Sequence, residues 1–197
     1  QLLCMRLTVN EIFYSLQGEG GRMGEASVFI RLSRCNLACS FCDTDFAEGE
    51  EMTLEEILDV IMQYPCKWII WTGGEPTIQL RDEHLMFFKE KSYKQAIETN
   101  GTRLVPEGID YITCSPKQRY EDVKNKIPFA NEIRLPVKVG DTLPDISLLP
   151  QADNYFLSPI FDGNRLNMEN VSYCVGLIKQ YPRWRLSLPI HKLIHIE

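Results

Sequence analysis

The 197-residue sequence contains no apolar run close to the roughly 20 residues that a membrane-spanning helix needs. Its first residues, QLLCMRLTVNE, lack the long apolar core and small-residue cleavage site of a signal peptide. There is no surplus of positive charge: the formal net charge is −6, which argues against broad binding to nucleic acid or to a membrane surface. We therefore expect a cytoplasmic protein with no nucleic-acid partner and no membrane association.

The sequence also has no internal repeat, no low-complexity segment and no linker rich in Pro, Gly and Ser that would separate domains. A chain of this length can form one compact domain that buries about 70% of the surface its unfolded form exposes. Hydrophobic residues make up 44% and charged residues 24% of the chain, as in an ordinary globular protein. We expect a single domain spanning residues 1–197.

Strand and helix patterns alternate along the chain. Short runs rich in β-branched and aromatic residues predict strands at 27–33, 67–72, 95–100, 110–115, 131–137, 154–159 and 184–189. A helix is expected to begin at Thr53, where Thr53 and Glu56 form a capping box, and further helices are expected at 81–92 and 167–181. The stretch 35–52 is expected to be a loop. Strands separated by helices predict an α/β fold with a mostly parallel sheet, closed or open.

Distinctive residues follow the carboxyl ends of four predicted strands. They are three cysteines after 27–33, Gly73-Gly74-Glu75-Pro76 after 67–72, Thr99-Asn100 at the end of 95–100, and Ser115-Pro116-Lys117 after 110–115. Functional groups gather at this end of parallel strands. The sequence therefore predicts one functional rim.

Seven cysteines are present, although a disulfide framework is not expected in a reducing cytosol. Four are scattered and are expected to be buried apolar residues, whereas Cys35, Cys39 and Cys42 have the spacing C-x3-C-x2-C. Thiolates bind soft metals and iron–sulfur clusters. Three thiolates would leave one iron of a 4Fe–4S cluster open, as a catalytic cluster needs. A zinc site with a distant fourth ligand and three free thiols are the alternatives.

The segment CNLACSFC, with Phe41 before Cys42, resembles the signature of the radical S-adenosylmethionine (SAM) superfamily. This resemblance implies that SAM chelates the open iron, is cleaved by one electron, and yields a 5′-deoxyadenosyl radical that abstracts hydrogen from the substrate. GGEP alone could be a tight turn. Beside the cysteine motif it resembles the second signature of the superfamily, which binds the methionine amino group of SAM; there Glu75 could be a polar partner or a solvated turn residue.

Longer segments resemble one family within this superfamily, the 7-carboxy-7-deazaguanine synthases. They are EIFYSLQGEG (11–20), FIRLSRCNLACSFCDT (29–44), TGGEP, TNGT and SPK. The resemblance implies an abbreviated, modified (β/α) barrel, a homodimer, a flavodoxin-like reductant, and cofactors that comprise a 4Fe–4S cluster, SAM and Mg²⁺. It implies a lyase that contracts the ring of 6-carboxy-5,6,7,8-tetrahydropterin to 7-carboxy-7-deazaguanine for queuosine-type deazapurines, with no catalytic residue beyond the cluster and cofactor.

The resemblance also implies residue roles. SAM would contact Phe41, Cys42, Asp43, Gly74, Glu75, Ser115, Pro116, Lys117, Ser158, Pro159, Ile160 and Phe161. The pterin would contact Leu16, Gln17, Gly18, Glu19, Arg31, Thr72, His191 and the chain end at Glu197. Among these, the Arg31 guanidinium suits the substrate carboxylate, and Gln17 and Glu19 suit the donor and acceptor edge of a pterin. Thr44 would offer Mg²⁺ a hard oxygen ligand.

The chain differs from the family toward its C-terminus. The family often has glutamine before the proline that corresponds to Pro159, where this chain has Ser158, and glutamine or threonine where Pro189 and Ile190 precede His191. Three other functions stay open on the sequence. They are an activase that installs a glycyl radical on a partner protein, a non-catalytic zinc or iron–sulfur module, and a relative with an intact cluster and another small substrate.

Overall fold

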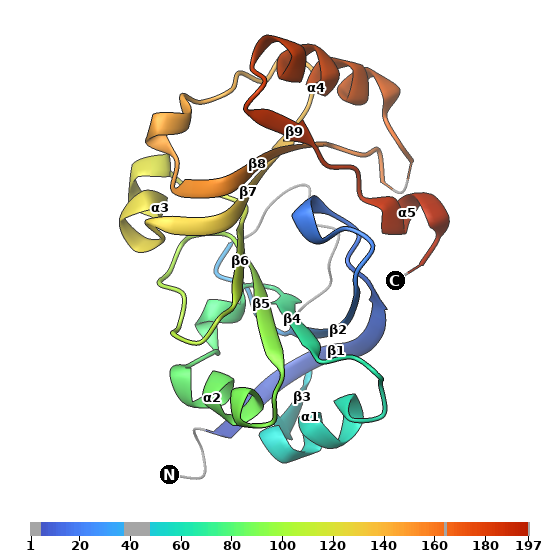
Figure 1. Ribbon diagram of the computed structural model, residues 1–197, viewed down its shortest axis with the longest axis vertical. Coiled ribbons are helices and arrows are strands. Elements are labelled where there is room, and N and C mark those ends of the chain that lie inside the picture. Colours follow the sequence, from blue (N-terminus) through green and yellow to red (C-terminus); the bar gives the residue numbers. More distant parts are fainter. Residues whose placement is uncertain (1–4, 38–47, 164, 197) are drawn as a thin grey trace. The chain divides into compact units, whose positions relative to one another are not determined.

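The computed structural model describes residues 5–37, 48–163 and 165–196, and Figure 1 labels their helices and strands. Two compact units make up the chain. The first unit comprises Gln1–Ser15, Ala26–Thr99 and Arg103–Ile112, and the second comprises Leu16–Glu25, Asn100–Thr102 and Thr113–Glu197. The expectation of a single domain over residues 1–197 stays a prediction.

The sheet of the first unit has the strand order β3-β1-β2-β4-β5. These strands are β1 (Arg6–Leu16), β2 (Ala26–Leu32), β3 (Glu50–Thr53), β4 (Trp68–Gly73) and β5 (Lys94–Thr99). β2 pairs with β4 and β4 with β5 in parallel, whereas β3 runs antiparallel to β1. The parallel pairing places the carboxyl ends of β2, β4 and β5 at one edge of this sheet.

The expectation of a loop over the whole stretch 35–52 was wrong at its end, because β3 begins at Glu50. β3 is the edge strand of this sheet and pairs only with β1 among the described strands. Its sequence, EEMT, does not alternate apolar and polar residues. Charged side chains are common on an edge strand, which is exposed to water. The backbone pairing with β1, which no side-chain pattern reveals, therefore determines this strand.

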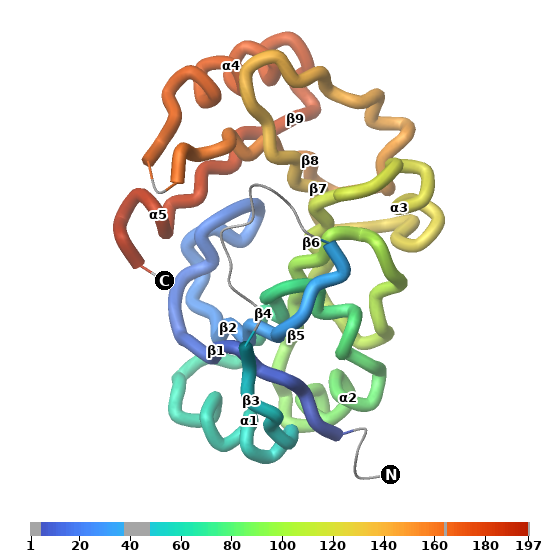
Figure 2. Tube along the Cα trace, turned by 180° about the vertical axis from the view of Figure 1, so that it is seen from behind, coloured from blue at the N-terminus to red at the C-terminus, as the bar shows by residue number. Residues whose placement is uncertain are grey.

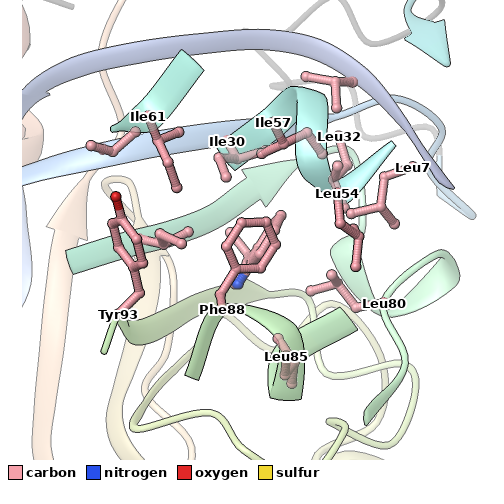
Figure 3. Close-up of a cluster of buried hydrophobic side chains, with 14 of the residues drawn as sticks. Leu7, Ile30, Leu32, Leu54, Ile57, Ile61, Leu80, Leu85, Phe88 and Tyr93 are labelled. Carbon is pink, nitrogen blue, oxygen red and sulfur yellow. The ribbon is translucent and has the colours of Figure 1, made fainter. Parts of the chain in front are cut away.

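Two helices of the first unit, α1 (Leu54–Ile61) and α2 (Asp82–Glu90), contact each other and pack on the core. α1 begins as predicted: the Glu56 amide donates to Thr53 Oγ1 (3.2 Å), and the Thr53 amide donates to Glu56 Oε2 (2.7 Å). Figure 3 shows Phe88 of α2 in the middle of the buried cluster that α1 and the strands complete. A short 3₁₀ helix, η3 (Pro76–Ile78), follows β4.

The second unit contains the last two residues of β6 and the whole of β7, β8 and β9, which pair in parallel in this order. These strands are β6 (Tyr111–Cys114), β7 (Phe129–Val137), β8 (Gln151–Pro159) and β9 (Trp184–Leu186). The helices are α3 (Tyr120–Lys126), α4 (Met168–Gln180) and α5 (Ile190–Ile194), with 3₁₀ turns η2 (Gly20–Arg22) and η4 (Ile146–Leu148). α4 packs on β8 and β9, and Figure 2 shows it alongside β9.

The strand predicted at 184–189 is shorter in the structure and ends at Leu186. Pro189 has no N–H to give to a strand ladder, and its φ of −72° suits the residue before a helix. α5 therefore begins at Ile190, and His191 lies on a helix instead of at a strand end. Within the described parts of the chain, no helix is both long and apolar enough to cross a membrane.

Candidate functional site

The glycine turn after β4 lies against the chain that leaves β2. The Gly74 amide donates to the Leu32 carbonyl and the Glu75 amide donates to the Arg34 carbonyl, both at 3.0 Å. A Cβ atom on Gly74 would overlap the Arg34 carbonyl oxygen and come within 2.9 Å of the Cys35 amide nitrogen. Only glycine permits so close an approach. The structure thus brings the GGEP turn and the first cysteine of the C-x3-C-x2-C segment together.

Glu75 is fully buried, so of the two alternatives for this residue the solvated turn residue is excluded. Its Oε1 atom accepts hydrogen bonds from the Thr77 amide (3.1 Å), Thr77 Oγ1 (2.6 Å) and Thr99 Oγ1 (2.8 Å). A buried carboxylate needs such donors because it has lost its hydration. Thr99 ends β5, so the carboxylate joins the ends of two neighbouring strands and fixes the turn.

Cys35 is half-buried beside this turn and follows Arg34, whose φ is +74°. A thiol at this place, next to backbone without a Cβ, fits one ligand of an iron–sulfur cluster. Cys66, Cys114 and Cys174 are buried, as expected of structural cysteines. The other residues predicted for the cluster, for Mg²⁺ or around the bound SAM in this segment, together with the chain end, lie outside the described residues: Cys39, Phe41, Cys42, Asp43, Thr44 and Glu197.

Arg31 and Thr72 are direct partners in the parallel pairing of β2 with β4. Side chains of paired residues leave a sheet on the same face, so two residues expected to bind substrate share one face. Arg31 Nε lies 3.2 Å from Glu11 Oε2, and its guanidinium lies 5.5 Å from the centre of the Phe13 ring. The Arg31 side chain is 23% exposed and is held from two sides.

The loop after β1 belongs to the second unit and carries Leu16, Gln17, Gly18 and Glu19. Gln17 is buried, and its Oε1 accepts a hydrogen bond from the Glu19 amide at 3.1 Å. A Cβ on Gly18 would overlap the His191 ring, and the Ile190 amide donates to the Gly18 carbonyl at 3.0 Å. The structure thus places His191 of α5 against the loop, although the two are far apart in sequence.

Glu19 meets a residue predicted to contact SAM. Its Oε1 atom lies 3.3 Å from Ser158 Oγ, which donates to it. Its Oε2 atom accepts a hydrogen bond from Arg134 Nη1 at 2.9 Å. Ser158 and Pro159 are the last residues of β8, so this contact lies at the carboxyl end of that strand.

Two charged residues of the second unit were not predicted from the sequence. Glu132 and Arg134 lie on β7 and are almost fully buried, and Arg134 Nε is 3.0 Å from Glu132 Oε1. They occupy alternate positions in NEIRLPV, so both side chains leave the same face of the strand. Charged residues are rarely buried unless they are paired. Two charges of opposite sign at this spacing in a mostly apolar strand therefore indicate a buried ion pair, and this signal is present in the sequence.

The remaining residues predicted to contact SAM also follow strands of the second unit. Ser115, Pro116 and Lys117 follow β6, and the Lys117 amide donates to the Asn100 carbonyl at 3.2 Å. Ile160 and Phe161 follow β8, and Lys192 Nζ lies 5.7 Å from the centre of the Phe161 ring. Ser115, Pro116 and Lys117 therefore occur at one of the four strand ends where the sequence predicted functional residues, and Ile160 and Phe161 occur at the end of a further strand.

Comparison with known proteins gives the class first. The model of the Radical SAM superfamily matches residues 29–129 of this chain. This span contains the glycine turn and the cysteine segment, whose first cysteine, Cys35, the structure places beside that turn. The match and the parallel α/β fold define a radical SAM enzyme.

Full-length relatives give the family. A 7-carboxy-7-deazaguanine synthase of Bacteroides thetaiotaomicron is 44% identical over 193 residues, covering 98% of this chain and 100% of the relative. One from Haemophilus influenzae is 43% identical over 197 residues, covering 95% of this chain and 92% of the relative. The crystal structure of QueE from Escherichia coli matches with a TM-score of 0.74 and 26% identity, covering 93% of this chain and 94% of that one. The chain belongs to the 7-carboxy-7-deazaguanine synthase family.

Several predictions from the sequence are thereby confirmed. The fold is α/β with mostly parallel strands, of the radical SAM type. The protein is an enzyme, and its cofactors are a 4Fe–4S cluster and SAM. The assignments of individual residues to cofactor and substrate stay predictions.

Proposed function

We propose that this enzyme converts 6-carboxy-5,6,7,8-tetrahydropterin into 7-carboxy-7-deazaguanine on the route to queuosine-type deazapurines. The observation that carries the proposal is identity of 44% over the full length of a relative with that name. The conversion removes one ring nitrogen as ammonia, and substrate and products balance without net oxidation or reduction. A radical intermediate therefore fits the reaction, because a hydrogen atom taken at the start can be returned at the end.

The first unit supplies residues for the cluster and for SAM. Cys35, with Cys39 and Cys42, would bind three irons, and the backbone of Gly74 and the buried Glu75 would receive the amino group of SAM. When bound, these cofactors supply a carbon radical that abstracts hydrogen. The protein supplies position: the hydrogen bonds of Glu75 to Thr77 and Thr99 hold the turn where a cationic amino group can approach.

The proposed SAM contacts outside this turn are Phe41, Asp43, Ser115, Pro116, Lys117, Ser158, Pro159, Ile160 and Phe161. Those among the described residues follow or end a strand, as expected for a ligand bound at the carboxyl ends of parallel strands.

For the substrate, we propose that Arg31 forms a charge-assisted pair with the pterin carboxylate. Thr72, on the same face of the sheet, would add a hydroxyl contact. Leu16, Gln17, Gly18, Glu19, His191 and Glu197 would complete the substrate contacts. The carboxylate of Glu19 is suited to accept hydrogen bonds from the N–H groups of a pterin edge.

Further parts of the proposal concern metal, partners and location. Thr44 would be a protein ligand of Mg²⁺, with most other ligands from substrate and water. The enzyme would act as a homodimer in the cytoplasm, with a flavodoxin-like protein as electron donor. The whole chain, 1–197, would work as one radical SAM domain.

The test is an anaerobic assay of the iron-reconstituted protein with reductant, SAM, Mg²⁺ and 6-carboxytetrahydropterin, followed by mass spectrometry. Formation of 7-carboxy-7-deazaguanine supports the proposal. 5′-Deoxyadenosine without that product would leave the radical chemistry and refute the substrate, favouring a relative with another small substrate. A full cluster with neither product would favour a glycyl-radical activase, and one zinc with no iron would favour a non-catalytic module.

Two variants sharpen this assay. Cys39→Ala should lose the cluster and all SAM cleavage, whereas Cys174→Ala, which removes a thiol buried in the second unit, should retain both. Thr44→Ala should keep the cluster and need more Mg²⁺ for the same rate. An unchanged Mg²⁺ dependence would remove Thr44 from the metal site.

A further inference from the structure

We propose that Arg134 and Glu132 are positioning residues that fix the carboxylate of Glu19 for the substrate. The inference rests on the proposed function, since it assigns to Glu19 a contact with the pterin. It goes further in naming two buried residues of β7 that determine how well Glu19 makes that contact.

The three residues form a continuous series of charges. Glu132 Oε1 lies 3.0 Å from Arg134 Nε, and Arg134 Nη1 lies 2.9 Å from Glu19 Oε2. Arg134 therefore contacts the two carboxylates through two different nitrogens of one planar group: Nη1 donates a hydrogen bond to Glu19, and Nε forms an ion pair with Glu132. Because a guanidinium is rigid and planar, the ion pair with Glu132 at one side of it restricts where the N–H groups at its other side can lie.

Glu132 is itself held in place by two hydrogen bonds, and Gly20 leaves room for its carboxylate. The Gly21 amide donates to Glu132 Oε2 at 2.7 Å, and Thr113 Oγ1 donates to Oε1 at 3.3 Å. A Cβ on Gly20 would overlap the Glu132 carboxylate, and the φ of Gly20 is +71°. Glu132 thus holds the backbone just after Glu19 directly, and the Glu19 side chain through Arg134.

The other side of this loop has its own supports. The Gly20 amide donates to Ser187 Oγ at 2.9 Å, and Ser158 Oγ donates to Glu19 Oε1 at 3.3 Å. Both oxygens of Glu19 therefore have a protein donor. A carboxylate oxygen has more than one lone pair, so each can still accept a hydrogen bond from a ligand.

Exposure separates the roles of the three charges. The Glu19 side chain is 25% exposed, whereas those of Arg134 and Glu132 are 6% and 2% exposed. Of the three, only Glu19 is accessible enough to touch a ligand. Arg134 and Glu132 therefore act through Glu19, which makes them positioning residues and not catalytic ones.

The test compares Arg134→Met and Arg134→Lys with Arg185→Met, which removes an exposed arginine of the same unit. Arg134→Met should raise KM for 6-carboxytetrahydropterin by roughly ten- to hundredfold, the range that losing one charge-assisted hydrogen bond gives. Arg134→Lys should recover part of that loss because it keeps a cation between the two carboxylates. Arg185→Met should leave KM unchanged.

Two further readouts exclude a merely structural effect. SAM cleavage without substrate, measured as 5′-deoxyadenosine, should fall by a much smaller factor in Arg134→Met than substrate affinity does, and substrate binding without reductant should weaken by the same factor as KM rises. In Glu19→Gln, adding Arg134→Met should have little further effect on KM, because residues that act through one another are not additive. Glu132→Gln, which keeps the side-chain shape, gives the same comparison if Arg134→Met does not fold.

The outcomes distinguish this inference from the proposed function. If the wild-type protein makes no 7-carboxy-7-deazaguanine, the proposed function fails before any variant is compared. If the wild type makes it and Arg134→Met keeps the wild-type KM, the inference is overturned and the function stands. Equal losses of substrate-free SAM cleavage and of substrate affinity, or additive effects of Glu19→Gln and Arg134→Met, would also overturn it.

Discussion

Gly74→Ala is the substitution whose effect follows most directly from the geometry of the glycine turn in the first unit. The new methyl group would overlap the Arg34 carbonyl oxygen and lie 2.9 Å from the Cys35 amide nitrogen. Both are backbone atoms, so no side-chain rotation relieves the overlap. The two segments must move apart, and this movement displaces the first cysteine of the cluster segment.

The cost can be worked out from the bonds that hold the segments together. Separation lengthens the hydrogen bonds from Gly74 to Leu32 and from Glu75 to Arg34, each 3.0 Å. Two such bonds contribute about 1–3 kcal/mol together, and overpacking strain adds about 1–3 kcal/mol. We expect the free energy of unfolding of the cluster-free protein to fall by about 2–6 kcal/mol.

The assay is urea unfolding of the cluster-free protein, together with iron and sulfide content after anaerobic reconstitution. Gly176→Ala is the matched control, because Gly176 lies in α4 and a Cβ there meets nothing within 4 Å. It should raise the unfolding free energy by about 0.5–1 kcal/mol and leave iron content unchanged. If Gly74→Ala unfolds like the wild type and binds its full iron, the proposed role of this close approach is refuted.

Three further predictions concern stability and thiol reactivity. Thr53→Ala should lower the free energy of unfolding by about 1 kcal/mol because the helix cap is lost. Hydrogen bonds from the Thr53 amide and hydroxyl lower the pKa of Glu56 below its ordinary value of 4.5, so these bonds stabilise the fold above that pH. In urea unfolding, the difference in stability between variant and wild type should therefore become smaller as acid protonates Glu56. Phe88→Ala should lower the free energy of unfolding by about 3–5 kcal/mol, because Phe88 is fully buried. Met86→Ala, on the exposed side of the same helix, should change the free energy of unfolding by less than about 0.5 kcal/mol. Equal losses of stability in the two variants would contradict the packing in Figure 3. Burial raises the pKa of the Cys174 thiol to about 11, so iodoacetamide at pH 8 should label it only after denaturation, as mass spectrometry would show.

Much of the fold could be predicted because local patterns and tertiary structure agree. The apolar run before Gly73 forms the buried strand β4, and the Thr53 capping box begins α1 where the sequence places it. β3 could not be predicted in the same way. Its strand state comes from pairing with β1, a contact that depends on residues more than 40 positions away, as the pair Arg6↔Thr53 shows.

The candidate site divides along similar lines. The sequence motifs predicted functional roles for Gly74, Glu75 and Arg31. In the structure, Gly74 and Glu75 follow β4, and Arg31 lies on the neighbouring strand β2. The burial of Glu75 could not be predicted, because its donors include Thr99, a residue 24 positions along the chain. A carboxylate in a glycine turn has the same local sequence whether water or threonine hydroxyls surround it.

Glu132 and Arg134 show where a more informative sequence signal lies. Charges at positions i and i+2 of a strand share a face, and on a strand flanked by apolar residues that face is buried. Burial of two opposite charges is costly unless they are paired and hydrogen-bonded, so the pattern predicts further polar partners from other segments. Here the partner is the loop of Glu19, Gly20 and Gly21, which has a positive-φ glycine where the Glu132 carboxylate approaches it. Charged pairs within apolar strands, considered together with distant glycine-containing motifs, therefore indicate which residues hold a ligand-binding loop in place.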